Sequence, residues 1–328
     1  MKVRIFILVN ILLWGEVFSQ DLHHTQFFNN TLSLSPALAG SVKNKKYNGG
    51  GVYLSHRNQW SKLNYSVLSN TISGDFNVNN NFGNLGFLIN QDQVGSTDYR
   101  TLSANAIYAY DLSLGRYSDW NAKFGLQVGF QNSNIAFNKV KFEDQIDPFF
   151  GVVRASQNVM PGQSASYLNS AISGVVHNEK LYFGYSLHNL NAPKYSFLEN
   201  ANQLSIPRRH SMFAGIKILG SHDQELHVDV LYMNQKNFND FIGGVRVNLG
   251  FPEIGAYYRR SIFNESNADA ISLMIAANFQ RLKIAYNSDI TISSLSTNMP
   301  FSSEISVRYF FHNAYQKTYG RFPSFPIH

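Results

Sequence analysis

Four aspartate and histidine residues could in principle carry acid–base chemistry: Asp144, Asp147, His188 and His210. A His/Asp pair acts as a catalytic base only when a nucleophile or water lies beside it and a third group orients it. Nothing in the spacing of these four residues fixes such a set, and Asp residues in loops more often initiate turns. We therefore predict no catalytic residues and a protein that is not an enzyme.

Metal and cofactor chemistry is poorly supported as well. His23 and His24 are adjacent, so their side chains point apart in an extended segment, and no carboxylate lies at ligand spacing. The chain has no Cys, which removes thiolate ligands, thiol nucleophiles and disulfides. Its net charge of +6 comes from scattered Lys and Arg residues rather than a basic stripe, so nucleic acid is not an expected partner. We expect no metal site and no cofactor.

The elements that must position these side chains are strands. From residue 65 to residue 311, runs of roughly ten residues with alternating apolar and polar side chains are separated by turn residues. Ile271 and Leu273 fall on one face of such a run and Ser272 on the other, because successive strand side chains point to opposite faces. A water-soluble β-protein would need a second sheet to bury these apolar faces. A sheet in lipid must instead close on itself, so we predict an all-β fold, a transmembrane antiparallel β-barrel of the outer membrane.

The pattern predicts about fourteen strands, an even number as bacterial barrels require. We place them near residues 48–57, 65–76, 82–92, 99–112, 120–137, 164–178, 181–190, 209–220, 224–234, 238–249, 252–263, 269–279, 282–288 and 302–311. Long connections at 138–163, 191–208 and 289–301 follow odd-numbered strands, whereas those after even-numbered strands are mostly tight. Long extracellular loops and short periplasmic turns have this arrangement when both termini lie in the periplasm.

Charged residues within the strands are expected to face the lumen, since an Arg or Lys on the lipid face at mid-membrane costs roughly 2–4 kcal/mol. Six are candidates for a polar network that packs the closed barrel: Arg246, Arg259, Arg308, Asp75, Glu253 and Glu304. The composition, 15% charged and 14% aromatic, suits a polar lumen with aromatic girdles at both membrane interfaces.

The chain divides into four parts. Residues 1–19 have the charged start, apolar core and small-residue end of a secretory signal peptide, with cleavage at Ser19/Gln20, so we expect the outer membrane of a Gram-negative bacterium. Residues 20–46 form an N-terminal segment that would either plug the lumen or cap its periplasmic mouth. Residues 47–311 form the barrel, and residues 312–328 form a periplasmic C-terminal tail.

A set of short motifs in a fixed order carries a family resemblance. They are Gln20-Asp21, Gln26-Phe27-Phe28-Asn29, Leu34-Ser35-Pro36-Ala37-Leu38-Ala39-Gly40, Arg57-Asn58-Gln59-Trp60, Ser73-Gly74-Asp75, Tyr286-Asn287-Ser288-Asp289 and Glu304-Ile305-Ser306-Val307-Arg308-Tyr309. Together they resemble the PorP/SprF family of the type IX secretion system, over essentially the whole mature chain.

This resemblance implies an outer-membrane accessory component of the type IX secretion system. Members of the family assist the export or surface attachment of particular large adhesins, including adhesins used in gliding motility. The implied partners are a secreted surface adhesin as client, type IX translocon components and a periplasmic peptidoglycan-binding protein. Outer-membrane lipid and lipopolysaccharide would surround the barrel.

Aromatic residues in two of the long loops are candidates for contact with such a client. They are Phe149 and Phe150 in the first loop, and Tyr195, Phe197 and Leu198 in the second. Exposed aromatic side chains at a loop tip favour a binding surface. An equally good interpretation is that the loops fold over the lumen and bury their own aromatic residues.

The motif residues also have structural interpretations. Pro36 and Gly40, with Ala37 between them, would steer the chain into the first strand, because Pro fixes its own φ and Gly permits a sharp bend. Arg57, Gln59 and Trp60 end the first predicted strand, where Trp would anchor the membrane interface. Arg57 would either help to anchor that interface or pair with lipopolysaccharide or a loop carboxylate. Asp289 and Glu304 belong to the closing motif of the resemblance.

The same pattern of strands is also compatible with a second function. Fourteen strands with an N-terminal segment in the lumen also resemble the fatty-acid transporter barrels. The alternative to a secretion accessory is therefore a passive or transporter-like outer-membrane channel for small solutes.

Overall fold

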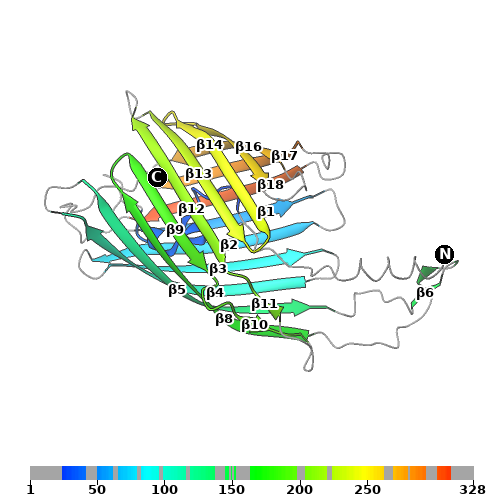
Figure 1. The fold of residues 1–328 in the computed structure, drawn as a ribbon. Coiled ribbons are helices and arrows are strands. Elements are labelled where there is room, and N and C mark those ends of the chain that lie inside the picture. The colour runs from blue at the N-terminus through cyan, green and yellow to red at the C-terminus, as the bar shows by residue number, and fades with distance from the viewer. Residues whose placement is uncertain are drawn as a thin grey trace, which may run out of the picture.

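The fold is a closed antiparallel β-barrel of fourteen strands (Figure 1). The structure is a computed structural model, and it describes residues 24–41, 50–61, 66–79, 83–95, 99–115, 119–136, 145–147, 149, 151–152, 163–197, 204–219, 224–261, 269–279, 281–292 and 301–311. Within these residues, no helix is both long and apolar enough to cross a membrane. The predicted signal peptide, its cleavage site and the C-terminal tail lie outside the described residues.

The barrel strands follow one another around the wall in chain order. They are β1 (Gly50–Gln59), β2 (Val67–Asn79), β3 (Gly83–Val94), β4 (Tyr99–Ser113), β5 (Asn121–Ile135), β8 (Gln163–His177), β9 (Leu181–His188), β12 (Arg209–Leu219), β13 (Glu225–Gln235), β14 (Phe238–Asn248), β15 (Glu253–Ser261), β16 (Ala270–Phe279), β17 (Leu282–Thr291) and β18 (Phe301–Phe311). The barrel closes where β1 pairs with β18, with Gly50 opposite Phe311 and Arg57 opposite Glu304. The predicted fold class and strand number are confirmed.

The observed end of β17 differs from the predicted one, and this changes the position of the motif residue Asp289. The sequence pattern ended this strand at residue 288, whereas the observed strand continues to Thr291. Alternation is the physical reason, because Asp289 faces the lumen and Ile290 faces outward, as a strand requires. Asp289 therefore lies in the barrel wall and not in a loop.

Two ends of the barrel differ in their connections. One end of the barrel carries the connections from β2 to β3, β4 to β5 and β8 to β9, together with Gly50 and Phe311, and we call it the short-turn end. The long-loop end carries the long connections after β5, β9 and β17. Two short hairpins lie in these connections, β6 (Ile146–Asp147) with β7 (Gly151–Val152), and β10 (Lys194–Tyr195) with β11 (Leu204–Ser205). The pattern did not predict them because two residues are too short to alternate.

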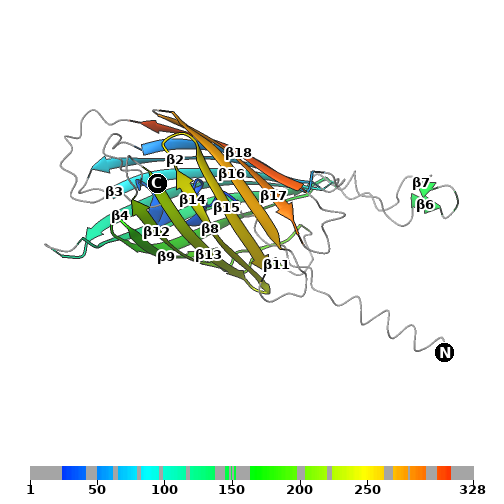
Figure 2. The ribbon, with the colours of Figure 1, turned by 90° about the horizontal axis from the view of Figure 1, so that it is seen from above.

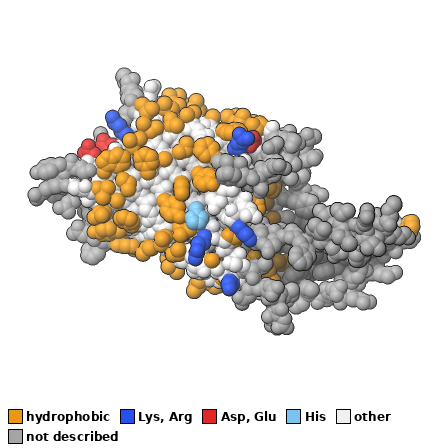
Figure 3. All heavy atoms as spheres, in the orientation of Figure 1, with side chains coloured by type: hydrophobic (Ala, Val, Ile, Leu, Met, Phe, Trp, Pro, Cys, Tyr) orange, Lys and Arg blue, Asp and Glu red, His pale blue; other side chains and the backbone are white. Residues whose placement is uncertain are grey.

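The barrel wall is apolar outside and polar inside. Leu126, Val128 and Phe130 on β5 are all at least half exposed, whereas Gln127 between them is buried. Figure 3 shows apolar side chains over much of the outer wall in that view, with few charged groups among them. This is the surface that a membrane barrel presents to lipid.

The N-terminal segment, defined here as residues 24–41, lies inside the barrel and is blue in Figures 1 and 2. It contains one α-helical turn, α2 (Thr31–Leu34), and a 3₁₀ turn, η1 (Pro36–Leu38). Its apolar side chains join inward-facing residues of distant strands in one buried cluster: Phe27, Phe28, Leu34, Ala37 and Leu38 with Tyr182, Phe213, Leu231, Ile242 and Tyr257 among others. The core of the molecule is thus built between this segment and the wall.

Candidate functional site

Three motif residues from separate parts of the sequence meet around the start of the N-terminal segment. Arg57 Nη2 lies 2.9 Å from Asp289 Oδ2, and Arg57 Nη1 lies 3.2 Å from Glu304 Oε2. Thr25 bonds to all three, since its backbone N donates to Glu304 at 3.0 Å, its hydroxyl donates to Asp289 at 2.7 Å, and Arg57 Nη1 donates to its hydroxyl. We call Thr25, Arg57, Asp289 and Glu304 the latch.

The expectation that Arg57 anchors the membrane interface is wrong. Its side chain is 3% exposed and faces the lumen, and Gln59 is buried on the same face. The reason is that two carboxylates on β17 and β18 lie at the same level of the lumen, and an ion pair there avoids a charge in lipid. Trp60 follows directly and is half-buried, and its backbone N donates to Ser302 Oγ at 3.2 Å.

The Pro36-to-Gly40 motif forms a second attachment, toward the short-turn end. Ala37 N donates to Ser173 Oγ on β8 at 2.8 Å, and Gly40 N donates to Asp75 Oδ2 on β2 at 2.6 Å. Gly40 has a φ of 66°, and a Cβ there would collide with the side chain of Asn84. Glycine is therefore required both for the backbone conformation and for the close approach to the wall.

A charged network on β13 to β17 holds the middle of the segment. Glu253 lies 3.1 Å from Arg246 and 2.8 Å from Lys283. Phe28 stacks on Tyr257, with ring centroids 5.1 Å apart, and Arg246 lies 4.7 Å from the centroid of the same Phe28 ring. The predicted lumen network is present for Arg246 with Glu253, whereas Glu304 takes Arg57 as its partner.

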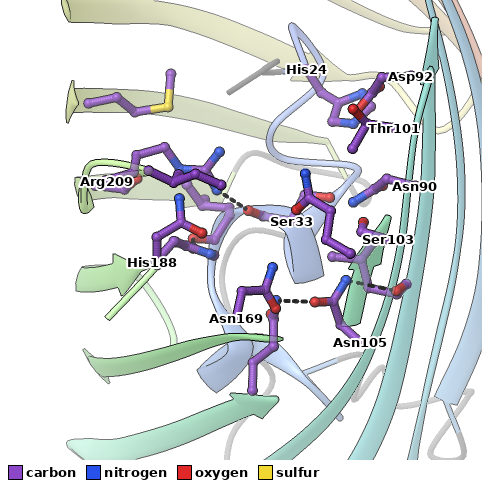
Figure 4. A pocket seen from close by; sticks show the side chains of 18 of the residues that line it. His24, Ser33, Asn90, Asp92, Thr101, Ser103, Asn105, Asn169, His188 and Arg209 are labelled. Atoms are coloured by element: carbon purple, nitrogen blue, oxygen red, sulfur yellow. Dashed lines mark hydrogen bonds between the residues drawn. The ribbon is translucent and has the colours of Figure 1, made fainter. Parts of the chain in front are cut away.

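A cavity of about 390 Å³ lies between the N-terminal segment and the wall, toward the long-loop end. Figure 4 shows Arg209 and His188 on one side of it and Asn90, Thr101 and Ser103 on the other. His188 Nε2 lies 3.2 Å from the carbonyl oxygen of Leu34, and Arg209 donates to the carbonyl oxygen of Ser33 at 3.4 Å. These contacts fix the N-terminal segment as one wall of the cavity.

The loop aromatics predicted to contact a client lie in different settings. Tyr195 lines the cavity, and its ring centroid lies 5.4 Å from that of Tyr167 and 5.5 Å from that of Phe197. Phe149 is 91% exposed. Phe150 and Leu198 lie outside the described residues.

The two histidines first considered for acid–base chemistry are not brought together. His188 faces the lumen, whereas His210 bonds to the hydroxyl of Tyr185 at 2.8 Å on the outer side. Asp144 lies outside the described residues. Within the described part of the chain, no group of three or more His, Asp or Glu residues could hold a metal ion.

Comparison with known proteins identifies the family. The family model described as "Type IX secretion system membrane protein PorP/SprF" matches residues 16–309. The chain belongs to the PorP/SprF family. As a PorP/SprF protein with a closed barrel, it is an outer-membrane component of the type IX secretion system. No curated protein matches the chain.

Solved structures resemble this PorP/SprF chain in fold. The toluene transporter TbuX of Ralstonia pickettii has a TM-score of 0.51 at 8% identity, over 87% of this chain and 94% of that one. The CymD monoaromatic hydrocarbon channel has a TM-score of 0.50 at 10% identity, over 87% and 93% of the two chains. Identities this low establish a shared barrel fold and nothing about what the lumen carries.

Most residues of the cavity were not singled out from the sequence. Thr101, Ser103 and Asn105 on β4 alternate with outward-facing side chains, so their inward direction was readable. A local sequence pattern cannot show which of these wall residues the N-terminal segment covers. That depends on contacts between residues on opposite sides of the barrel.

Proposed function

We propose that this chain is an accessory of the type IX translocon that assists the export or surface attachment of one large secreted adhesin, in some settings an adhesin of gliding motility. The observation that supports this most strongly is the attachment of the N-terminal segment inside the barrel. The latch, the Phe28 contacts and the Gly40 contact hold the segment against β1, β15 and β2, so a secreted polypeptide would have to pass beside this barrel.

The client contact in this proposal lies at the long-loop end. A 91% exposed Phe149 is a favourable anchor for a protein partner, since exposed aromatic side chains gain most from burial at an interface. Phe150, Tyr195, Phe197 and Leu198 complete the proposed surface. The short-turn end then faces a periplasmic peptidoglycan-binding protein, and the apolar outer wall contacts lipid and lipopolysaccharide.

Affinity purification from crosslinked outer membranes, followed by mass spectrometry, tests this proposal. Wild type should recover type IX translocon components and one very large surface protein. Phe149→Ser should recover the translocon components and lose most of the surface protein. Phe251→Ser, at an exposed position of the short-turn end, is the matched control and should retain both. Recovery of no type IX component and no surface protein would overturn the proposal.

A channel for small solutes is the second candidate, and the cavity of about 390 Å³ is the observation that favours it. TbuX and CymD, which share the fold, are described as a toluene transporter and a hydrocarbon channel. Deletion of the gene should then abolish uptake of a radiolabelled small solute, and the wild-type chain should restore it. Unchanged uptake together with loss of surface adhesin would reject the channel.

A further inference from the structure

The cavity at the long-loop end is lined unevenly, and this unevenness points to a ligand class. One wall is polar and continuous across three neighbouring strands: Asn90 and Asp92 on β3, Thr101, Ser103 and Asn105 on β4, and Gln127 and Gln131 on β5. The residues alternate along each strand, so their side chains share the inner face. Amides and hydroxyls, which both donate and accept hydrogen bonds, dominate this wall.

The opposite side of the cavity is mixed, because an apolar patch lies there beside the polar side chains of Arg209 and His188. Phe27 and Leu34 come from the N-terminal segment, and Leu231 and Met233 come from β13. Tyr167 and Tyr195 stand toward the long-loop end, with ring centroids 5.4 Å apart. A ligand with hydroxyl-like groups on one edge and an apolar face on the other would match the polar wall and this apolar patch.

The charged residues that line the cavity narrow the class of ligand further. Asp92 and Arg209 line the cavity with opposite signs, and Arg209 already donates to the carbonyl oxygen of Ser33. The balance of these two charges favours a neutral ligand. A hydrocarbon would strip water from the amide wall without replacing its hydrogen bonds, which is unfavourable for each buried polar group.

We propose that this cavity binds a neutral carbohydrate, with sugar hydroxyls bonded to the amides and hydroxyls of β3, β4 and β5, and with the apolar face of the ring against Phe27 and Leu34. A pyranose ring has this division between a hydroxyl edge and a C–H face. The same chemistry occurs in free oligosaccharides and in sugar chains of the surface polysaccharide of the outer membrane. Carbohydrate binding at this cavity does not depend on the proposed role in adhesin export, because it requires only the folded barrel.

Isothermal titration of the purified full-length barrel in detergent tests this proposal. The probes are a set of neutral di- to tetrasaccharides, delipidated surface polysaccharide from the same outer membrane, and toluene. Gln131→Leu removes hydrogen-bonding groups from the polar wall at similar volume. Asn132→Leu is the matched control, because Asn132 is the next residue of β5 and bonds to Ser166 on the outer side.

We expect saturable binding of at least one saccharide, about tenfold weaker in Gln131→Leu and unchanged in Asn132→Leu, since one lost hydrogen-bonding group typically weakens binding by about this factor. Binding of the free oligosaccharides identifies a soluble ligand, whereas binding of the surface polysaccharide alone identifies a membrane sugar. Binding of toluene without any saccharide overturns the proposal, as does the absence of saccharide binding by a correctly folded barrel. Equal loss in both variants also overturns it.

Discussion

The two halves of the lumen use the same kind of polar wall in different ways. Toward the short-turn end, η1 packs so closely that Ala37 is fully buried and a Cβ on Gly125 would collide with the backbone of Pro36 and Ala37. Toward the long-loop end, the segment leaves a cavity of about 390 Å³ against β3, β4 and β5. Inward polar side chains thus hold the segment where it contacts them, and line a cavity where it does not.

The latch should be the most sensitive attachment of the N-terminal segment, and it lies toward the long-loop end of β1, β17 and β18. Arg57→Leu leaves Asp289 and Glu304 buried near each other without their guanidinium partner, and breaking a buried ion pair from one side typically costs about 3–5 kcal/mol. We expect a large fall in the unfolding temperature, measured by the heat-dependent mobility shift of the barrel in SDS gels. Arg260→Leu, on the exposed side of β15, is the control and should unfold like wild type. If the Arg57→Leu barrel is as heat-resistant as wild type, the latch does not stabilise the folded barrel.

A smaller effect is expected where η1 touches the wall. Gly125→Ala forces a side chain against the backbone of η1, and overpacking of this kind costs about 1–3 kcal/mol. Backbone amides at Leu38 and Ala39 should lose protection in hydrogen–deuterium exchange as η1 shifts away. Gly174→Ala is the matched control on β8, because its Cβ would meet only the Phe124 ring, at 3.8 Å. Equal protection in the two variants would contradict the close packing of this half.

The cavity half should tolerate substitution with the smallest change in stability. Gln131→Leu alters a side chain that lines the cavity, so we expect the free energy of unfolding to stay within about 0.5 kcal/mol of wild type. Urea unfolding of the barrel in lipid vesicles measures this difference. A loss comparable to that of Gly125→Ala would mean that the two halves do not differ as described.

Strand alternation made most of this fold predictable. Residues such as Ile271 and Ser272 fall on opposite faces whatever the rest of the chain does, so the fourteen strands and the difference between the two ends followed from local pattern. Contacts between distant residues did not. The meeting of Thr25, Arg57, Asp289 and Glu304 depends on barrel closure and on the path of the N-terminal segment. Arg57 at a strand end therefore suggested a membrane interface, although its side chain lies in the lumen.

Single-channel recording in planar bilayers tests most directly whether the N-terminal segment closes the barrel. We expect the wild-type chain to insert without steady conductance, because the segment is attached to the wall at the latch, at Phe28 and at Gly40. Gly125→Ala, which displaces η1, should open intermittently. A wild-type barrel that conducts steadily, at the level of Gly125→Ala or above, would contradict the closed lumen and favour the solute channel.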